Sequence, residues 1–134
     1  MKPIRYKVFI SSTQKDSDLA RDLARRLESA GATVVSVGET PDGKRFKAAI
    51  DRSLREADEL VLIVSPDSVN SPSLMFEMGA AFSARKLVTP VLVGIDPSEL
   101  PPPFRYVASV KYSALEDYIS EIAKRTRVPQ LDVA

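Results

Sequence analysis

The sequence of 134 residues contains no cysteine and no histidine. Their absence excludes disulfides, thiol nucleophiles, serine–histidine triads and zinc sites built from nitrogen or sulfur ligands. Any chemistry must therefore use carboxylates, hydroxyls, lysine, arginine, tyrosine or backbone amides. We expect no metal site.

An excess of charge of one sign is also missing. Lys and Arg number 19 against 18 Asp and Glu, which gives a formal net charge of +1. The arginines of the first predicted helix stand among acidic residues, so they form no basic block. Proteins that bind nucleic acid through its phosphates need concentrated positive charge. We therefore expect no nucleic-acid partner.

Long apolar runs are absent as well. No segment approaches the roughly 20 apolar residues that a membrane-spanning helix needs. The first residues, Met1 to Arg5, lack the apolar core of a signal peptide. We expect a cytoplasmic protein with no membrane partner.

The remaining composition is typical of one globular domain. Hydrophobic residues make up 44% and charged residues 28% of the chain. This length is enough for one hydrophobic core and short for two. We expect a single domain over residues 1–127 and a C-terminal tail or linker stub over residues 128–134. Whether the chain was part of a longer multidomain protein stays open.

Short apolar strands alternate with amphipathic helices along the chain. The expected strands are residues 6–10, 33–37, 60–64, 91–93 and 107–110. Four helices are expected. The first begins at about residue 17 and stops at Gly31, the second covers 44–57, the third has Pro72 in its first turn and lies in segment 71–82, and the fourth covers 114–124. This alternation is typical of an α/β fold with a doubly wound, five-stranded parallel sheet of the flavodoxin-like kind and helices on both faces.

Polar loops are predicted at the carboxyl ends of three strands. In a doubly wound sheet, ligands bind beyond these ends, near the point where the strand order reverses. The loops are residues 11–16, 38–43 and 65–72, and the first and third are rich in serine. Asp16 or Ser17 is expected to cap the helix that follows the first loop.

Glu77 lies in the most apolar helical segment, residues 71–82. The residues three and four positions away on a helix carry no positive charge: Ser73, Leu74, Ala80 and Ala81. Such a glutamate either reaches solvent or a loop amide, or lies in a cleft for a functional reason. The residues alone leave both interpretations open.

Five segments carry recognisable motifs: residues 8–16, 38–46, 57–65, 71–81 and 89–93. In this order they resemble the motifs of Toll/interleukin-1 receptor (TIR) domains of the bacterial type. The resemblance covers residues 6–125 and implies the TIR fold.

The resemblance also implies an activity. Many TIR domains cleave NAD+, and their catalytic glutamate falls on Glu77. The implied enzyme is an NAD+ glycohydrolase, or a cyclase that makes a cyclic ADP-ribose, with NAD+ as substrate and no other cofactor. The implied setting is bacterial antiphage defence or signalling, with activation by homotypic self-association.

The resemblance places further residues at the nucleotide: Ser11, Ser12, Thr13, Gly43, Phe46 and Ser73. Hydroxyls and amides at a helix N-terminus can bind ribose or phosphate, although loop serines also satisfy their own backbone. Phe46 matches an aromatic that stacks on the nucleotide, although a core position suits it slightly better. Ser73 stands where catalytic members often carry tryptophan, and Ser12 where an aromatic is usual.

A lone carboxylate suits this reaction. O-glycosidases need two carboxylates because an alcohol leaves poorly unless it is protonated. Nicotinamide in NAD+ is already cationic and leaves as a neutral molecule, so one carboxylate facing the oxocarbenium ion suffices. Two alternatives remain: a non-catalytic TIR adaptor domain, and an enzyme similar to nucleoside deoxyribosyltransferases. A phosphoacceptor receiver is disfavoured, because the third strand leads into Ser65 instead of an aspartate.

Overall fold

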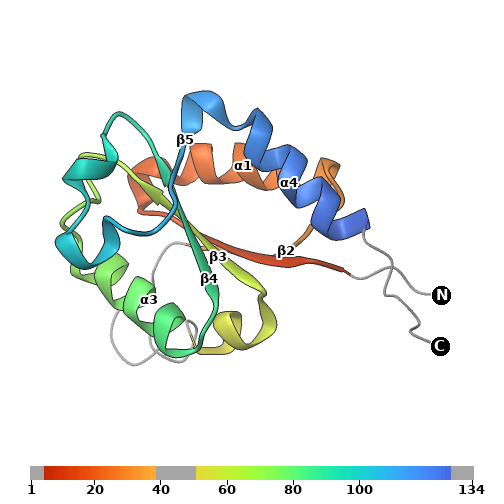
Figure 1. Ribbon diagram of the computed structural model, residues 1–134, viewed down its shortest axis with the longest axis horizontal. Helices are drawn as coiled ribbons and strands as arrows, with labels where there is room; N and C mark the ends of the chain where they lie inside the picture. Colours follow the sequence, from red (N-terminus) through yellow and green to blue (C-terminus); the bar gives the residue numbers. More distant parts are fainter. Residues whose placement is uncertain (1–4, 39–50, 128–134) are drawn as a thin grey trace.

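The structure, a computed structural model, describes residues 5–38 and 51–127. A five-stranded sheet with the order β2-β1-β3-β4-β5 forms its centre, and every neighbouring pair is parallel. Figure 1 shows the strands between two layers of helices. The strands are β1 Lys7–Ser11, β2 Thr33–Gly38, β3 Glu59–Val64, β4 Leu87–Leu92 and β5 Val110–Lys111.

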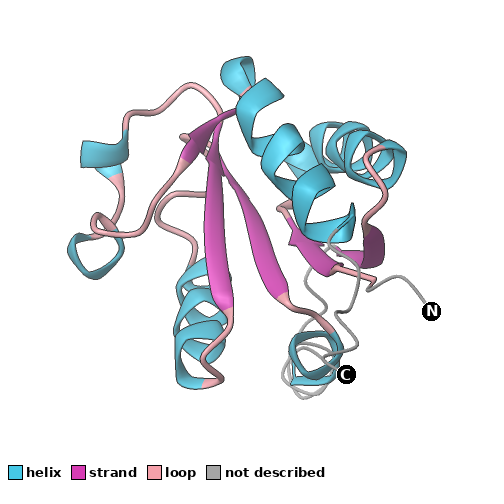
Figure 2. Ribbon diagram, turned by 45° about the vertical axis from the view of Figure 1, so that its right-hand side comes forward, coloured by secondary structure: helices cyan, strands magenta, loops and turns pink. Residues whose placement is uncertain are grey.

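Helices cover both faces of this sheet. Helices α1 and α4 lie on one face, and α3 lies on the other with the helical residues 51–56 (Figures 1 and 2). The predicted five-stranded doubly wound fold is therefore confirmed. The three labelled helices are α1 Ser17–Ser29, α3 Pro72–Ser83 and α4 Glu116–Arg127.

Alternation along the central strands divides the core into two clusters. Val8 and Ile10 of β1 pack toward α1 and α4, whereas Phe9 between them packs toward α3. In β3 every residue is buried, as expected for a strand covered on both faces. The strands are thus fixed from both sides, and the loops at their carboxyl ends stand on a rigid base.

Gly31 ends the turn after α1, as the sequence predicts. Its φ of 104° lies in the left-handed region that glycine adopts without steric cost. A Cβ at this position would also lie 2.9 Å from the Thr126 hydroxyl oxygen on α4. The glycine thereby lets α1 and α4 approach each other.

Two strand predictions were wrong in extent. The fifth strand was expected over residues 107–110, but β5 contains only Val110 and Lys111. The preceding residues complete a turn, with the Val107 amide bonded to the Phe104 carbonyl at 3.3 Å. Strand β4 begins at Leu87, earlier than the predicted 91–93, because it pairs with β3 along its whole length, whereas β5 pairs only with its last two residues. Pro90 is therefore tolerated, since β4 is an edge strand there.

Helix predictions also needed correction at their ends. Helix α4 begins at Glu116 instead of 114, because Tyr112–Ala114 forms a separate 3-10 turn. Asp16 occupies the N-cap position of α1 but makes no side-chain capping bond. Of the predicted helix over residues 44–57, the described part is helical over 51–56, and the C-terminal residues 128–134 lie outside the described part.

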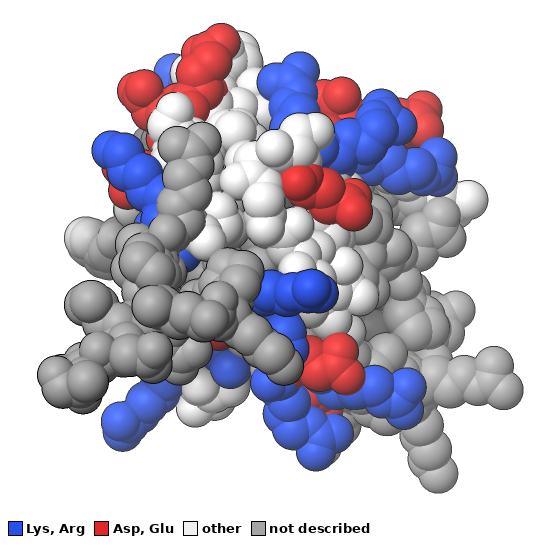
Figure 3. Space-filling view, turned by 90° about the vertical axis from the view of Figure 1, so that its right-hand side faces the viewer, with Lys and Arg blue, Asp and Glu red and all other residues white. Residues whose placement is uncertain are grey.

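Charges of both signs share the surface. On the face drawn in Figure 3, Lys and Arg lie next to Asp and Glu at the top and at the bottom of the view. Within α1, Arg21 pairs with Asp18, while Arg25 and Arg26 pair with Asp22. None of the described helices is long and apolar enough to cross a bilayer.

Candidate active site

The candidate site lies where the strand order reverses. β1 is the second strand of the sheet, and its neighbours β2 and β3 continue the chain in opposite directions along the sheet. The loops that leave β1 and β3 therefore diverge, and this divergence opens a binding crevice in doubly wound folds. Helix α3, which carries Glu77, begins directly after the loop that leaves β3.

A narrow crevice occupies this place, and Glu77 forms part of its wall. Its inner volume is about 10 Å³, roughly the space of one water molecule. Six of its residues carry a hydroxyl or a carboxyl group. The lining residues are Ser11, Ser12, Thr13, Leu62, Ser71, Ser73, Leu74 and Glu77.

The structure brings together five of the seven residues that the sequence assigned to the site. They are Ser11, Ser12, Thr13, Ser73 and Glu77. Their roles at a nucleotide stay predictions. The other two, Gly43 and Phe46, lie outside the described residues.

Three lining residues were missed: Leu62, Ser71 and Leu74. Leu62 and Leu74 belong to the core cluster beneath α3, and a core leucine gives no sign in the sequence that it also lines a site. Ser71 could have been found, because it is the N-cap residue of α3 and stands at the end of the serine-rich loop.

Glu77 is buried although no positive charge balances it. Its side chain is 1% exposed, and no ion pair among the described residues includes it. The Ser11 hydroxyl donates a hydrogen bond to the carboxylate. Its Oε2 atom is buried without a hydrogen-bond partner in the described part of the chain. The interpretation of Glu77 as a solvent-exposed surface residue is therefore wrong.

Burial without a balancing charge changes the acidity of Glu77. Loss of solvation raises the pKa of its carboxyl from 4.5 to about 7, although the hydrogen bond from Ser11 lowers it. The group therefore exchanges its proton near neutral pH. A buried acid with this property in a crevice is a candidate for catalysis, because such a group costs stability and packing alone gives no reason to keep it.

A second buried glutamate shows the contrast. Glu59 at the start of β3 is fully buried, but both oxygen atoms of its carboxylate accept hydrogen bonds. It accepts hydrogen bonds from four side chains: Tyr6, Thr89, Tyr118 and Arg125. We therefore interpret Glu59 as structural and Glu77 as functional.

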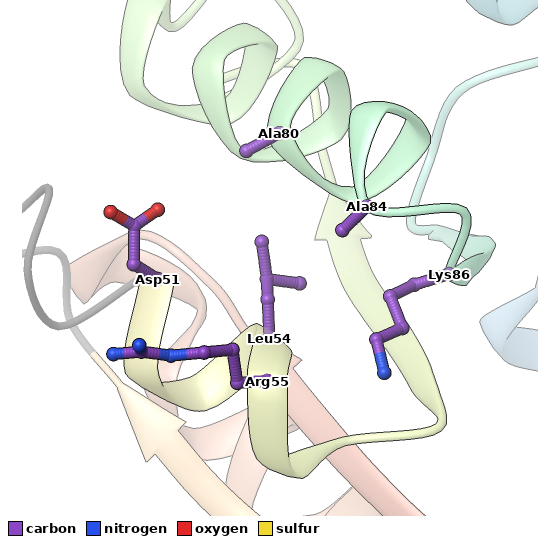
Figure 4. Close-up of a pocket in the computed structure, with 6 residues that line it drawn as sticks. All are labelled: Asp51, Leu54, Arg55, Ala80, Ala84 and Lys86. Atoms are coloured by element: carbon purple, nitrogen blue, oxygen red, sulfur yellow. The ribbon is translucent and has the colours of Figure 1, made fainter.

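Larger hollows lie elsewhere on the molecule. Figure 4 shows one of about 420 Å³ between residues 51–56 and the end of α3, with Leu54 pointing toward Ala80 and Ala84. Arg55 and Lys86 stand at its rim, next to the amino ends of β3 and β4. Of its six lining residues only Leu54 is buried. This hollow is larger than the Glu77 crevice, but the crevice contains the buried reactive carboxyl group and lies where the strand order reverses, so we place the site there.

Comparison with known proteins supports the fold and the family. The TIR domain family model matches residues 8–126. No curated protein sequence matches the chain. Among solved structures, a TIR-STING receptor from C. gigas is 24% identical with a TM-score of 0.67, and the match covers 96% of this chain and 42% of that receptor. The chain thus spans less than half of that receptor's length.

Two further structures share the fold. The TIR domain of the Toll-related receptor TRR-2 from Hydra magnipapillata is 17% identical with a TM-score of 0.67, over 90% of this chain and 93% of that one. A CMP N-glycosidase from Clostridium botulinum is 17% identical with a TM-score of 0.61, over 87% and 96% of the two chains. The family match spans nearly the whole sequence, so this chain belongs to the TIR domain family.

Proposed function

We propose that this TIR domain is an N-glycoside hydrolase that cleaves the nicotinamide–ribose bond of NAD+. The observation that carries the proposal is the buried, unbalanced carboxyl of Glu77 among serine and threonine hydroxyls. No ion pair among the described residues includes Glu77, so its negative charge is not balanced there. A cationic substrate supplies the missing positive charge, and the pyridinium ring of NAD+ is such a cation.

The reaction proceeds by loss of a neutral leaving group. The bond between ribose C1′ and the pyridinium nitrogen breaks, and its electron pair neutralises the ring. The ionised Glu77 stabilises the oxocarbenium ion that forms, and the hydroxyls of the crevice hydrogen-bond the ribose. Water then adds to C1′ and loses a proton, which gives ADP-ribose. If a ring nitrogen of the substrate's own adenine attacks instead, the product is a cyclic ADP-ribose.

Substrate entry requires the crevice to widen. Its inner volume of about 10 Å³ is far below that of a ribose ring. Ser11 to Thr13 form one wall, and Ser71 to Leu74 form the other. We propose that self-association of the domain separates these walls. In this proposal NAD+ loss or its product serves bacterial antiphage defence or signalling.

The test is nicotinamide release from NAD+ by concentrated protein in a crowding agent. We expect nicotinamide from the wild type and at least a hundredfold less from Glu77→Gln, because the amide keeps the shape without the charge. The matched control is Glu121→Gln on the exposed surface of α4, which should retain wild-type activity. Activity that survives in Glu77→Gln contradicts the catalytic role. No nicotinamide from visibly assembled wild type would favour the non-catalytic adaptor.

The pH dependence of kcat/KM distinguishes the ionised from the protonated form of Glu77. The proposed reaction needs the carboxylate, and its pKa is about 7 in the free protein. We therefore expect kcat/KM for NAD+ to rise about tenfold per pH unit below that pH and to level off above it. Steady-state rates between about pH 5 and pH 9 check this.

A decline of kcat/KM with rising pH would instead favour the second candidate function. A protonated Glu77 could donate its proton to a departing neutral base, as a nucleotide N-glycosidase or a deoxyribosyltransferase-like enzyme requires. The raised pKa favours this candidate, because the proton is held close to neutral pH. Product analysis with NAD+, CMP and deoxynucleosides as substrates separates the two.

A further inference from the structure

A chain of hydrogen bonds joins the two walls of the Glu77 crevice. On the first wall, the Thr13 hydroxyl bonds the Asp16 carboxylate at 3.3 Å. The Ser65 hydroxyl, in the loop after β3, bonds the same carboxylate oxygen at 2.7 Å. Ser68 Oγ accepts from the Ser65 amide at 2.9 Å, and the Ser71 amide bonds the Ser68 carbonyl at 2.9 Å. Ser71 is part of the second wall.

The central members of this chain are buried. Asp16 is 7%, Ser65 4% and Ser68 0% exposed. Buried side-chain hydrogen bonds have fixed geometry, and breaking one leaves a desolvated partner unsatisfied at about 1–3 kcal/mol. The capping role predicted for Asp16 is not fulfilled, so its carboxylate is free for the bond to Ser65. The loops after β1 and β3 are thereby held together.

We propose that Asp16, Ser65 and Ser68 are positioning residues, which hold the two walls of the substrate-free crevice together and keep bulk water away from the Glu77 carboxyl. They act through the walls and do not line the crevice themselves. The connection between the two walls follows from the geometry of these hydrogen bonds alone. The effect on turnover, by contrast, rests on the proposed function of Glu77.

The experiment measures the pKa of Glu77 by carbon-13 NMR of labelled glutamate side chains, with the signal assigned from Glu77→Gln. The variants are Ser65→Ala and Ser68→Ala, which remove one hydroxyl each and change no charge. If water enters, we expect the pKa to fall from about 7 to about 6 or below in both. Two variants are made so that the test can be completed even if one of them does not fold.

The matched control is Lys15→Met. It removes the ion pair of Lys15 with Asp67, which joins the same two loops at 3.6 Å but lies in solvent, with side chains 75% and 59% exposed. An exposed pair contributes little to loop geometry, and loss of a cation cannot lower the pKa of an acid. We expect Glu77 to titrate in this variant as in the wild type.

The outcomes separate this proposal from that for the enzyme. A lowered pKa in either folded serine variant, with the control unchanged, supports the positioning role even if no NAD+ is cleaved. An unchanged pKa in the folded serine variants, or an equal fall in Lys15→Met, overturns it. If NAD+ is cleaved, the midpoint of the kcat/KM profile should move downward by the same amount as the NMR titration.

Discussion

Replacing Glu59 with methionine is expected to lower the free energy of unfolding by about 3 kcal/mol, because buried hydrogen-bond donors lose their acceptor, whereas Arg125, 36% exposed, can still be solvated. Glu59 is fully buried and bonds Arg125 Nη1 at 2.7 Å. Tyr6 and Thr89 each donate to it at 2.6 Å. Methionine fills a similar volume but accepts none of these bonds, so several desolvated donors remain unsatisfied.

The network also connects elements far apart in the sequence. Glu59 begins β3, whereas Tyr118 and Arg125 lie on α4. Burial and the Glu59 carboxylate together raise the pKa of Tyr6 and Tyr118 above its usual range, so both hydroxyls stay protonated as donors. We therefore expect the loss of Glu59 to loosen α4 from the sheet.

Urea unfolding at neutral pH checks this prediction. The matched control is Glu121→Met, which removes an exposed i,i+3 pair with Lys124 and should change stability by about 0.5 kcal/mol or less. The double variant Glu59→Met with Arg125→Met should recover part of the loss, because it also removes the unpaired charge. A loss below about 1 kcal/mol in Glu59→Met would contradict the interpretation of this network as structural.

The sequence predicted the sheet because its signals are local. The continuous apolar run of β3 and the alternation of short strands with helices need no knowledge of distant contacts. The end of the chain was harder to predict. The position of β5 depends on the 3-10 turn at Pro102–Phe104 and on which residues reach β4, and neither is visible in residues 107–110 themselves.

The candidate site was predictable to the extent that it follows strand ends. Ser11, Ser12 and Thr13 follow β1, and parallel strands bring such residues to one edge of the sheet. The roles of Asp16 and Glu59 were not predictable, because Asp16 depends on a bond across 49 residues and Glu59 on bonds across 30 to 66 residues. The narrowness of the crevice is likewise a property of packing between two loops.

Replacing Glu77 with glutamine is expected to stabilise the protein relative to wild type at alkaline pH while it abolishes the proposed cleavage of NAD+. The folded-state pKa of about 7 exceeds the ordinary value of 4.5. Between these values the folded protein binds more protons than the unfolded chain, so stability falls as pH rises. The contribution of Glu77 is fully kept below about pH 4.5 and lost as pH rises through about 7. At about 1.4 kcal/mol per pKa unit, the shift of about 2.5 units corresponds to a loss of about 3.5 kcal/mol.

The difference in unfolding free energy between Glu77→Gln and wild type isolates this effect. Other titrating groups contribute equally to both proteins and cancel. We expect the difference to shift in favour of Glu77→Gln by about 2–3 kcal/mol between about pH 5 and pH 8, measured by urea unfolding. Glu121→Gln should show no such trend, because that side chain is exposed.

A difference that stays constant with pH would contradict the buried, unbalanced state of Glu77. The expected trend bears on function because the ionised form of Glu77 would lower stability, whereas the proposed reaction requires that form. Packing alone would favour a neutral side chain among Leu62, Leu74 and the serines of the crevice. A glutamate that weakens the fold at the pH where it is ionised fits a functional role of its charge, and the cationic substrate proposed above would supply the partner that its Oε2 atom lacks in the described structure.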